Sequence, residues 1–497
     1  MKMLRATLLV LGATLLVLVA VLVVRTSRYA SQAPVAALPA PARVQQAGVP
    51  SEPVDSAAVG RLSEAVRFKT ISYFDSAAKI SEFRKLHAFL EKAFPLVHKA
   101  MRREVLDSAT LLFTWRGTDT TLAPVLLMGH QDVVPVEPGT EKDWKHGAFS
   151  GDVADGFVWG RGTLDDKISV LGTLEGAESL LKRGYQPKRT VIFAFGYTEE
   201  IGGPSAMRTA ELLKARGIKP WFVMDEGGAL GDSLVPGVAQ RVALIGVSEK
   251  GYLSLRLTAH GQGGHSSIPP TETAVSILGD AVGRVQRTPL PSRLSDATLG
   301  MFNTLGPLMP YSRKLVMANL WLFDPVLRSA LARQPAGNAM IRTTTAATMM
   351  SGGIKDNVVP ATATAVINFR LLPGDSVHWV VSQVKQIVAD DRVDVAPIDG
   401  MAREASEVSP TDSEGYRVIA QSIREEFPGT HVSPYLLMGG TDARNFYIVT
   451  PNVYRFAPII AKGETFTLLH GTNERVSVEN YLAGISLYRR LIENATR

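Results

Sequence analysis

The chain of 497 residues contains no cysteine. Disulfide bonds, cysteine-ligated zinc and a cysteine nucleophile are therefore excluded. A serine nucleophile also lacks its usual setting, because no Gly-x-Ser-x-Gly turn occurs at the end of a predicted strand. A hydrolase that works through a covalent thiol or serine intermediate is accordingly disfavoured.

The main body of the chain has almost no surplus of charge of either sign. The formal charge of +6 comes mostly from residues 1–50, which hold five basic residues and no acidic one, whereas the remainder holds 48 basic and 47 acidic residues. A nearly neutral body gives no electrostatic support for binding nucleic acid. Its composition, 45% hydrophobic and 20% charged, is that of a globular protein, and the length predicts two domains with an appendage.

Long apolar runs are also scarce, and the one at Leu8–Val24 lies between basic residues near the N-terminus. It is longer than the core of a usual signal peptide and meets the minimum for a membrane span. The nearest small-x-small cleavage motif, Ser31–Ala33, lies well beyond its end. We therefore predict an uncleaved signal anchor over residues 1–25, with a cleaved signal as the alternative. An Ala/Pro-rich linker follows over residues 26–53, and the catalytic part is expected outside the cytoplasm, in a periplasmic, extracellular or lumenal location.

Beyond the linker, short apolar runs alternate with helical patterns. The runs expected to be buried strands are 126–128, 191–195 and 221–224, and the helices expected between them are 169–182 and 205–216. Such alternation predicts an α/β domain with a central, mostly parallel sheet. The same domain is expected to include residues 54–248 and 403–497.

Residues 249–402 follow a different pattern and predict a separate inserted domain. The order is a strand at 251–260, a helix at 272–285, strands at 343–350 and 363–371, and a helix at 377–389. An alternating strand followed by a helix, two strands and a helix predicts an α+β sandwich. The long stretch between Thr288 and Arg342 is an insertion within this domain.

Potential metal ligands follow three of the predicted strands. In chain order they are His130-Gln131-Asp132, Glu199-Glu200 and Asp225-Glu226, and they are joined by Asp165-Asp166 at a helix start and His470 near the C-terminus. The carboxyl ends of parallel strands share one edge of a sheet, so these groups should converge. A lone histidine or carboxylate is usually structural, but that explanation would have to hold independently at four or five positions. Imidazole and carboxylate groups together are suitable ligands for zinc.

Three strings resemble the metallopeptidase family of aminoacylase, glutamate carboxypeptidase and carboxypeptidase S. They are His130–Pro135, Gly160–Lys167 and Thr198-Glu199-Glu200, followed in the same order by Asp225 and His470. The resemblance covers residues 55–495, and the long insertion is most similar to the branch of carboxypeptidase S and secreted N-acyl amino acid hydrolases. It implies a zinc-exopeptidase-like catalytic domain and an inserted α+β sandwich that serves as a lid and dimerisation domain.

The resemblance also implies two Zn²⁺ ions per chain. The implied ligands are His130 and Asp225 for one ion, Glu200 and His470 for the other, and Asp165 as the bridge, with Asp166 as an alternative bridge. Asp132 would not bind the metal itself but would contact His130 and hold its ring in the orientation that the metal requires. Glu199 would be the general base that takes a proton from water and passes it to the leaving amine.

Further residues are implied on the substrate side. His265, in a glycine-rich turn, would stabilise the developing oxyanion, although an exposed structural histidine is the simpler explanation of the turn alone. Asn357 and Arg370 would hold the substrate carboxylate, for which a bidentate arginine is well suited. Gly440 and Thr441 lie in a second glycine-rich loop that resembles the family's substrate pocket.

The predicted function is a di-zinc hydrolase that cleaves an amide or peptide bond beside a free carboxylate, as a carboxypeptidase or dipeptidase does. The alternative is an N-acyl amino acid amidohydrolase, including one for N-fatty-acyl substrates; Met309, Leu315 and the apolar run Leu320–Phe323 fit an acyl chain or simply the core of the second domain. A catalytically silent, anchored metal-binding scaffold is a remote alternative, because Glu199 and every implied ligand are present. The expected partners are a small peptide or N-acyl amino acid, the membrane and, through the lid, a second copy of the chain.

Overall fold

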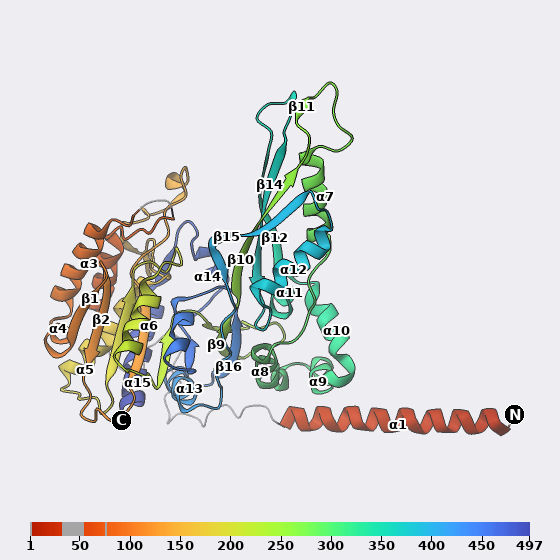
Figure 1. Cartoon of the computed structure of the whole chain (residues 1–497). Coiled ribbons are helices and arrows are strands. Elements are labelled where there is room, and N and C mark those ends of the chain that lie inside the picture. Colours follow the sequence, from red (N-terminus) through yellow and green to blue (C-terminus); the bar gives the residue numbers. More distant parts are fainter. Residues whose placement is uncertain (1, 32–53, 75–76) are drawn as a thin grey trace. The chain divides into compact units, whose positions relative to one another are not determined.

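The structure is a computed structural model that describes residues 2–31, 54–74 and 77–497 (Figure 1). Most of the predicted linker, residues 32–53, lies outside the described residues. The chain divides into two compact units. Unit 1 comprises Met1–Gln32, Ser248–Val408 and Leu436–Gly440, and unit 2 comprises Ala33–Val247, Ser409–Tyr435 and Thr441–Arg497. The catalytic and lid roles given to segments of the sequence stay predictions.

Unit 2 is centred on a mixed sheet whose middle strands are parallel. In the described chain the strand order is β1 (Arg102–Leu106), β2 (Thr110–Trp115), β6 (Val191–Gly196), β3 (Val125–His130), β7 (Phe222–Asp225), β17 (Val453–Arg455), β9 (Arg241–Glu249) and β16 (His431–Leu437), with β8 (Ala229–Asp232) on β9. Strand β3 runs parallel to β6 and β7, and β7 runs parallel to β17. The pairs β1–β2 and β2–β6 are antiparallel.

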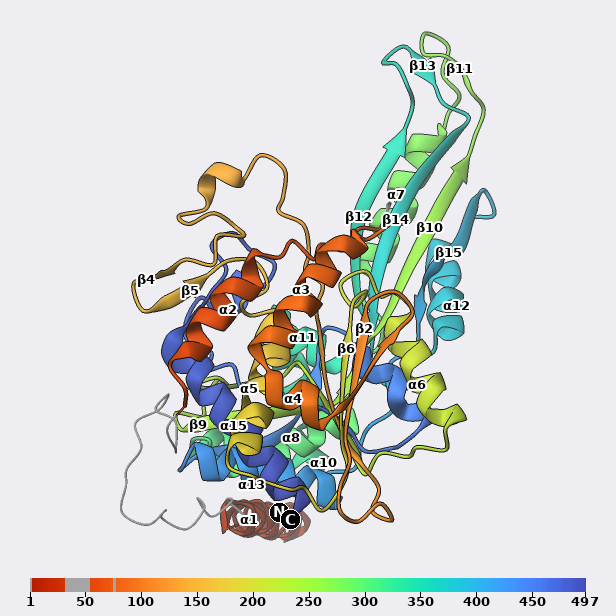
Figure 2. The same cartoon turned by 90° about the vertical axis from the view of Figure 1, so that its left-hand side faces the viewer.

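The central strands are apolar throughout because helices cover both faces of the sheet. Every residue of β3 and β6 is buried, as a strand covered on both sides requires. On one face, α6 (Ser205–Ala215) and η3 (Asp442–Ile448) pack on alternate side chains of the strands. Helices α5 (Lys167–Lys182) and α15 (Val478–Thr496) lie side by side, with α5 against β3 (Figure 2).

Smaller elements complete unit 2. Its other helices are α2 (Ala57–Arg67), α3 (Ile80–Ala93), α4 (Pro95–Ala100), η1 (Glu141–Asp143), α13 (Glu414–Glu426) and α14 (Thr465–Leu468). A three-stranded sheet joins β18 (Arg475–Ser477), β5 (Phe157–Trp159) and β4 (Val153–Ala154). Because β18 pairs with β5, backbone hydrogen bonds join the segment after His470 to the segment that precedes Asp165.

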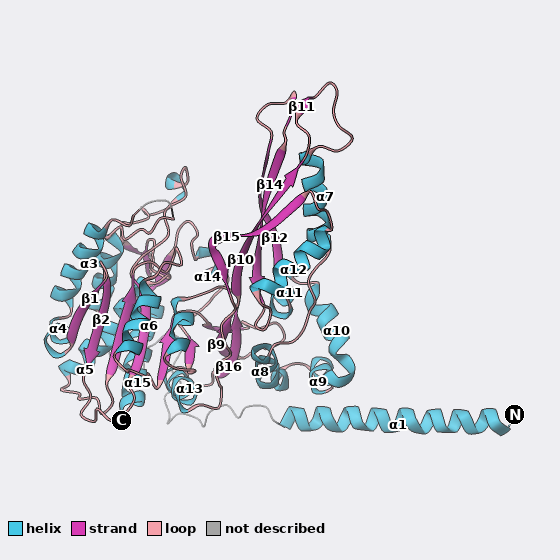
Figure 3. Cartoon of the chain, in the orientation of Figure 1, coloured by secondary structure: helices cyan, strands magenta, loops and turns pink. Residues whose placement is uncertain are grey.

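Unit 1 contains a separate antiparallel sheet, drawn in magenta in Figure 3. Its order is β12 (Thr344–Gly352), β14 (Thr362–Leu371), β10 (Gly251–His260) and β15 (Val393–Arg403). Residues of β14 alternate between buried and more exposed positions, so one face meets a core formed with α7 (Ala274–Arg287) and α12 (Val377–Val388). A short hairpin pairs β11 (Gly264–His265) with β13 (Val358–Val359).

The long insertion of unit 1 is helical. It forms α8 (Asp296–Leu305), η2 (Gly306–Leu308), α9 (Tyr311–Ala318), α10 (Leu320–Ala332) and α11 (Pro335–Ile341). At the N-terminus, α1 (Lys2–Ser31) is long and apolar enough over Met3–Ser31 to cross a membrane, as a signal sequence or as an anchor. Helices α9 and α10 are long and apolar enough to cross a membrane only if they are counted as one span. The chain bends by 119° between them.

The predicted fold class is confirmed. Unit 2 has the expected α/β architecture with a parallel centre, and unit 1 has the expected separate α+β layer. The predicted strand at 251–260 coincides with β10. The antiparallel edge formed by β1 and β2 was not predicted, because alternation with helices indicates only the parallel part of a sheet.

Candidate metal centre

Three parallel strands of unit 2 bring polar side chains to one edge of the sheet. His130 is the last residue of β3, Asp225 is the last residue of β7, and Glu199 follows shortly after β6. Because the carboxyl ends of parallel strands lie together, groups that are far apart in sequence meet there. The predicted convergence is therefore present in unit 2.

Asp165 lies at the middle of this cluster. Its Oδ1 is 2.9 Å from Nε2 of His130, and its Oδ2 is 3.0 Å from Nε2 of His470. The same Nε2 of His470 lies 3.1 Å from Oε2 of Glu200. Asp165 thus presents one oxygen to each histidine, which is the arrangement that a carboxylate bridging two metal ions requires.

Glu226, the neighbour of the predicted ligand Asp225, also approaches His130, and the ligand role of Asp225 stays a prediction. Oε1 of Glu226 is 3.4 Å from Nε2 of His130, and His130, Asp165 and Glu226 form one group able to hold a metal ion. Oδ2 of Asp225 instead accepts the backbone N–H of Ala443 at 2.7 Å. Successive residues of a strand point to opposite sides, and in this structure one oxygen of Asp225 faces η3. The second metal-binding group is Asp165, Glu200 and His470.

Asp132 connects His130 to the segment after β6. Nδ1 of His130 lies 2.9 Å from the carbonyl oxygen of Asp132 and 3.4 Å from its Oδ1. The carboxylate of Asp132 also accepts the backbone N–H groups of Glu199 and Glu200 at 3.3 and 3.2 Å. An Nδ1–H that donates to this carbonyl leaves the lone pair of Nε2 for a metal ion.

Glu474, which the sequence did not indicate, holds the loop that contains Asp165. Its Oε1 accepts the backbone N–H groups of Gly162 at 3.0 Å and Leu164 at 2.9 Å, and its Oε2 accepts Arg161 at 2.7 Å. Arg161 also donates to the carbonyl oxygen of His470 at 3.1 Å. The buried pair of Glu474 and Arg161 therefore fixes both the loop that contains Asp165 and the backbone at His470. A single glutamate in a loop gives no pattern by which the sequence could have revealed it.

The electrostatics of the cluster favour bound cations. Burial lowers the pKa of His130, but the nearby carboxylates of Glu226, Asp132 and Asp165 outweigh this effect and raise its pKa well above the usual value. Hydrogen bonds to Asp165 and Glu200 raise the pKa of His470 to about 10. Among the described residues, the buried Oε1 of Glu200 has no hydrogen-bond partner. Several carboxylates around two imidazoles, with one such oxygen unsatisfied, fit two divalent cations.

The environment of Glu199 raises the proton affinity of its carboxylate, and its role as general base stays a prediction. Burial, and to a smaller extent the carboxylates of Glu226, Asp442 and Glu200, raise its pKa well above the usual value, although His130 acts in the opposite direction. A carboxylate with a raised pKa accepts a proton more readily near neutral pH.

The predicted substrate-side residues are divided between the units. His265, Asn357, Arg370 and Gly440 belong to unit 1, and Thr441 belongs to unit 2. Within unit 1, the β11–β13 hairpin brings His265 close to Asn357, because the N–H of Ser266 donates to the carbonyl of Asn357 at 3.2 Å. The guanidinium of Arg370 lies 4.7 Å from the ring centre of Tyr252. The roles of these residues stay predictions.

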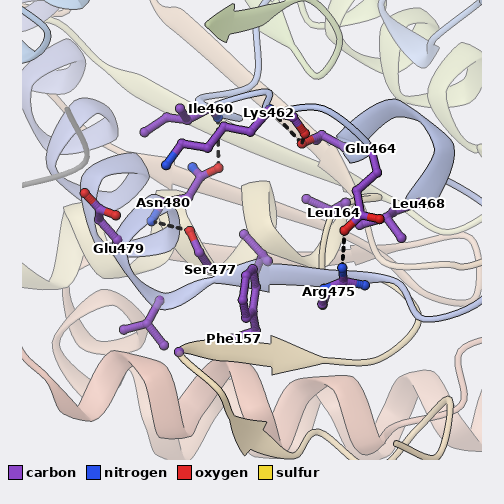
Figure 4. Close-up of a pocket in the computed structure, with 14 residues that line it drawn as sticks. Phe157, Leu164, Ile460, Lys462, Glu464, Leu468, Arg475, Ser477, Glu479 and Asn480 are labelled. Carbon is purple, nitrogen blue, oxygen red and sulfur yellow. Dashed lines mark hydrogen bonds and ion pairs between the residues drawn. The ribbon is translucent and has the colours of Figure 1, made fainter. Parts of the chain in front are cut away.

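A cavity of about 550 Å³ lies in unit 2 beside the loops of the cluster (Figure 4). Its walls include Phe157 and Ile460, together with Leu164 and Leu468, which lie one and two residues before Asp165 and His470. Some polar groups on the walls are paired, as in the hydrogen bond from the N–H of Ile460 to Asn480 at 2.8 Å. None of the cluster residues lines this cavity, so it is separate from the candidate metal centre.

Comparison with known sequences identifies the family of the chain. The sequence pattern of peptidase family M20/M25/M40 matches residues 126–494. The chain belongs to this family. It is 39% identical over 442 residues to the N-fatty-acyl-amino acid synthase/hydrolase PM20D1 of Xenopus tropicalis, covering 88% of this chain and 85% of the relative. It is 37% identical over 443 residues to the probable carboxypeptidase S-like 2 of Dictyostelium discoideum, with the same coverage.

Solved structures show the same fold. The M20 family metallo-carboxypeptidase of Sulfolobus solfataricus matches with a TM-score of 0.64 and 17% identity, over 88% of this chain and 98% of the other. Human carnosine dipeptidase 1 matches with a TM-score of 0.62 and 16% identity, over 88% and 96%. The predictions that this chain is an M20 member and an enzyme of the metallopeptidase and amidohydrolase type are confirmed.

Proposed function

We propose that this M20 enzyme is a di-zinc hydrolase that cleaves an amide bond beside a free carboxylate. The observation that supports it most strongly is the position of Asp165, whose two carboxylate oxygens face His130 on one side and His470 on the other. Asp225, the predicted ligand, or its neighbour Glu226 would complete the ligands of one ion, and Glu200 those of the other. When bound, such ions activate a water molecule and polarise the amide carbonyl.

Different residues of the chain would then act in different steps of the reaction. Asp132 holds His130 with its Nε2 directed into the cluster. Glu199 takes one proton from the attacking water and delivers it to the leaving nitrogen. A C–O bond forms, the C–N bond breaks, and the products are a carboxylic acid and an amine. No covalent attachment to the protein is needed, which agrees with the absence of cysteine.

The substrate-side assignments remain part of this proposal. Arg370 and Asn357 would bind the free carboxylate, Arg370 in a bidentate manner. His265 would stabilise the oxyanion, and Gly440 and Thr441 would contact the substrate. The matches between these positions and the resembled family support the assignments.

The first candidate substrate is a small peptide cut beside its C-terminal residue. The second is an N-acyl amino acid. The names of the relatives favour both, because one is a carboxypeptidase S-like protein and another an N-fatty-acyl-amino acid synthase/hydrolase.

We further propose that α1 is retained as a membrane anchor and that the catalytic part lies outside the cytoplasm. The length and composition of Met3–Ser31 support a membrane span. The basic residues Arg25 and Arg28 at its end would stop the span at the lipid headgroups. Possible dimer formation through unit 1 stays a prediction.

The test uses the zinc-loaded full chain and a panel of dipeptides and N-acyl amino acids, each also prepared with its carboxylate converted to an amide. We expect cleavage of the free acids and little cleavage of the amidated partners. Glu199→Gln should reduce the rate at least about 100-fold while zinc content is unchanged. The matched control is Glu211→Gln, an exposed position on α6, which should leave the rate unchanged. Equal cleavage of the amidated substrates, or an active Glu199→Gln enzyme, would contradict the proposal.

A further inference from the structure

The C-terminal end of α1 is docked on the helical insertion of unit 1. Thr26 and Tyr29 are buried there, and the hydroxyl of Tyr29 donates to the carbonyl oxygen of Phe302 at the end of α8. Nδ2 of Asn319, between α9 and α10, donates to Oγ1 of Thr26 at 3.3 Å. Nε of Arg25 donates to the carbonyl oxygen of Ala318 at 3.3 Å. The last turns of α1 are thus packed against folded protein rather than joined to it by the chain alone.

A glycine makes this contact possible. The hydroxyl group of Tyr29 lies so close to Gly306 that a Cβ at this position would collide with the ring and its oxygen. A larger residue at 306 would therefore displace α1 from the insertion. The contact between α1 and the insertion therefore depends on a tyrosine at position 29 and a glycine at position 306.

The insertion exposes large apolar side chains beside this contact. Trp321 and Val326 on α10 are 57% and 58% exposed, Leu322 is 40% exposed, and Tyr311 at the start of α9 is 58% exposed. Residues four apart lie on one side of a helix, so Leu322 and Val326 form a single apolar strip with Trp321 at its border. The interpretation of Trp321 and Leu322 as core of the second domain is therefore wrong.

The segment that carries this apolar strip has a positive net charge. Residues 311–341 contain four basic residues and one acidic residue, Asp324. Asp324 is paired with Arg328 at 2.7 Å. The adjoining end of α1 adds Arg25 and Arg28 without an acidic residue. An apolar helix face within a basic segment suits the interface of a bilayer that contains anionic lipids.

The position of the strip relative to α1 indicates which partner covers it. The exposed apolar part of α1 includes Val23 and Val24, within one turn of the Arg25–Ala318 hydrogen bond. Any bilayer that takes up this part of α1 must begin next to α9, which lies beside the C-terminal part of α1 in Figure 1 and leads into α10. A tryptophan and a tyrosine at this level are the side chains most enriched at membrane interfaces.

We propose that α9 and α10 form a second membrane contact, in which Trp321, Leu322 and Val326 enter the headgroup region of the bilayer that α1 crosses. The partner is a lipid surface, and anionic lipids strengthen the contact. This inference rests on the retention of α1 proposed above. Its consequence is that unit 1 is held against the membrane by two elements.

The absence of cysteine provides a direct test, because any introduced cysteine is the single labelling site of the chain. Val326→Cys and Trp321→Cys would each be labelled with a polarity-sensitive fluorophore in the full chain, reconstituted in phosphatidylcholine vesicles with and without phosphatidylglycerol. The matched control is Val358→Cys, which lies in the same unit, in β13, and is 42% exposed. A lipid with a nitroxide near its headgroup serves as the quencher.

We expect the labels at 326 and 321 to be quenched at least threefold more than the label at 358, and more strongly when phosphatidylglycerol is present. Labels at 326 and 358 that are equally exposed to water, in a chain shown by its intact mass to retain α1, would overturn the proposal. Shielding at 326 without lipid quenching, together with crosslinks between copies, would assign the surface to a second copy instead and overturn it as well. An intact mass that shows the loss of α1 would also overturn the proposal, because the proposal requires α1 to be retained. The substrate panel tests the proposed activity separately.

A second set of variants controls for the possibility that the label itself disturbs α10. In the chain labelled at Trp321→Cys, we expect the pair Leu322→Glu and Val326→Glu to reduce lipid quenching to the level of the control position. Val358→Glu, placed in the same labelled chain, should leave the quenching unchanged. Undiminished quenching in the doubly charged variant would contradict the assignment of this strip to the bilayer.

Discussion

At the scale of single residues, the candidate site depends on which carboxylate each strand end directs toward Asp165. Asp225 and Glu226 are adjacent and both acidic, yet only Glu226 approaches His130, at 3.4 Å. Asp225 accepts the backbone N–H of Ala443. The ligand role predicted for Asp225 stays a prediction, and Glu226 is a second candidate for the same position, because residue identity alone does not show on which side of β7 a side chain lies.

This difference leads to a prediction of metal content. Glu226→Gln removes a charged ligand candidate, so we expect the zinc content to fall from two ions per chain toward one. Asp225→Asn should retain both ions and instead lower the free energy of unfolding by about 1 kcal/mol, because a neutral amide is a weaker acceptor for Ala443. Metal analysis and urea unfolding of the two variants measure both effects. Zinc loss only in Asp225→Asn would assign the ligand role to Asp225 instead of Glu226.

His87 is a buried residue that fixes Gln131, the neighbour of His130. Nε2 of Gln131 donates to the carbonyl oxygens of Ala109 and Phe195 at 2.9 and 2.8 Å. Its Oε1 must then accept Nε2–H of His87 at 2.8 Å. Burial lowers the pKa of His87 from 6.5 to about 4, so this histidine is neutral in the folded chain.

The neutral state of His87 predicts a loss of stability in acid. Between pH 6.5 and 4 the unfolded chain binds a proton at this position that the folded chain does not. The free energy of unfolding should therefore fall as the pH decreases through this range, by up to about 3 kcal/mol. His87→Gln should show a smaller decrease between pH 6.5 and 4.5 in urea unfolding. The control is His378→Gln, an exposed position, and an unchanged pH dependence in His87→Gln would refute the assignment.

At the scale of elements, the segment after His470 positions the loop before α5. Glu474 accepts two backbone N–H groups of residues 162–164 and pairs with Arg161, which in turn holds the carbonyl of His470. These contacts place Asp165 and His470 relative to each other. Groups that orient metal ligands in this way commonly affect metal affinity about 10–100-fold.

We therefore expect Glu474→Gln to weaken zinc binding by about 10–100-fold without unfolding the chain. The amide keeps the shape of the side chain but loses the charge that pairs with Arg161. Competition with a chelator measures the affinity, and circular dichroism reports the fold. Glu479→Gln, exposed in the first turn of α15, is the control. Equal zinc affinity of the two variants would show that Glu474 has no part in positioning the site.

The contact between α5 and α15 relies on a glycine. A Cβ at Gly176 would lie 3.0 Å from the backbone nitrogen of Arg489, so Gly176→Ala should force the helices apart and cost about 1–3 kcal/mol. Gly60 in α2 has nothing within 4 Å of its own Cβ position, and Gly60→Ala should be neutral or slightly stabilising. Thermal unfolding compares them. A stable Gly176→Ala variant together with a destabilised Gly60→Ala variant would contradict this packing.

Elements were predictable where one physical signal dominates. The continuous apolar runs at β3 and β6 identify strands covered on both faces, and the alternation over Gly251–His260 identifies a strand covered on one face. The cluster was predictable because its groups follow strand ends. Glu226 and Glu474 were not, since one depends on side-chain direction and the other on a loop contact between distant segments.

At the scale of the whole molecule, the chain combines an M20 fold with a membrane-length helix and a helical insertion. The two candidate metal-binding groups found among the described residues lie in unit 2, whereas α1 and the insertion lie in unit 1. Substitutions in the insertion such as Leu322→Glu should therefore leave zinc content unchanged. Chemistry and attachment to the membrane can thus be tested separately in one protein.

The most direct test of the account is the number of zinc ions bound by the purified full chain under zinc-replete conditions, compared with Asp165→Ala. We predict two ions per chain in the unaltered protein and in Glu199→Gln, and fewer than one in Asp165→Ala, because Asp165 belongs to both metal-binding groups. No bound zinc in the unaltered chain, or an equal content in Asp165→Ala, would contradict the di-zinc centre.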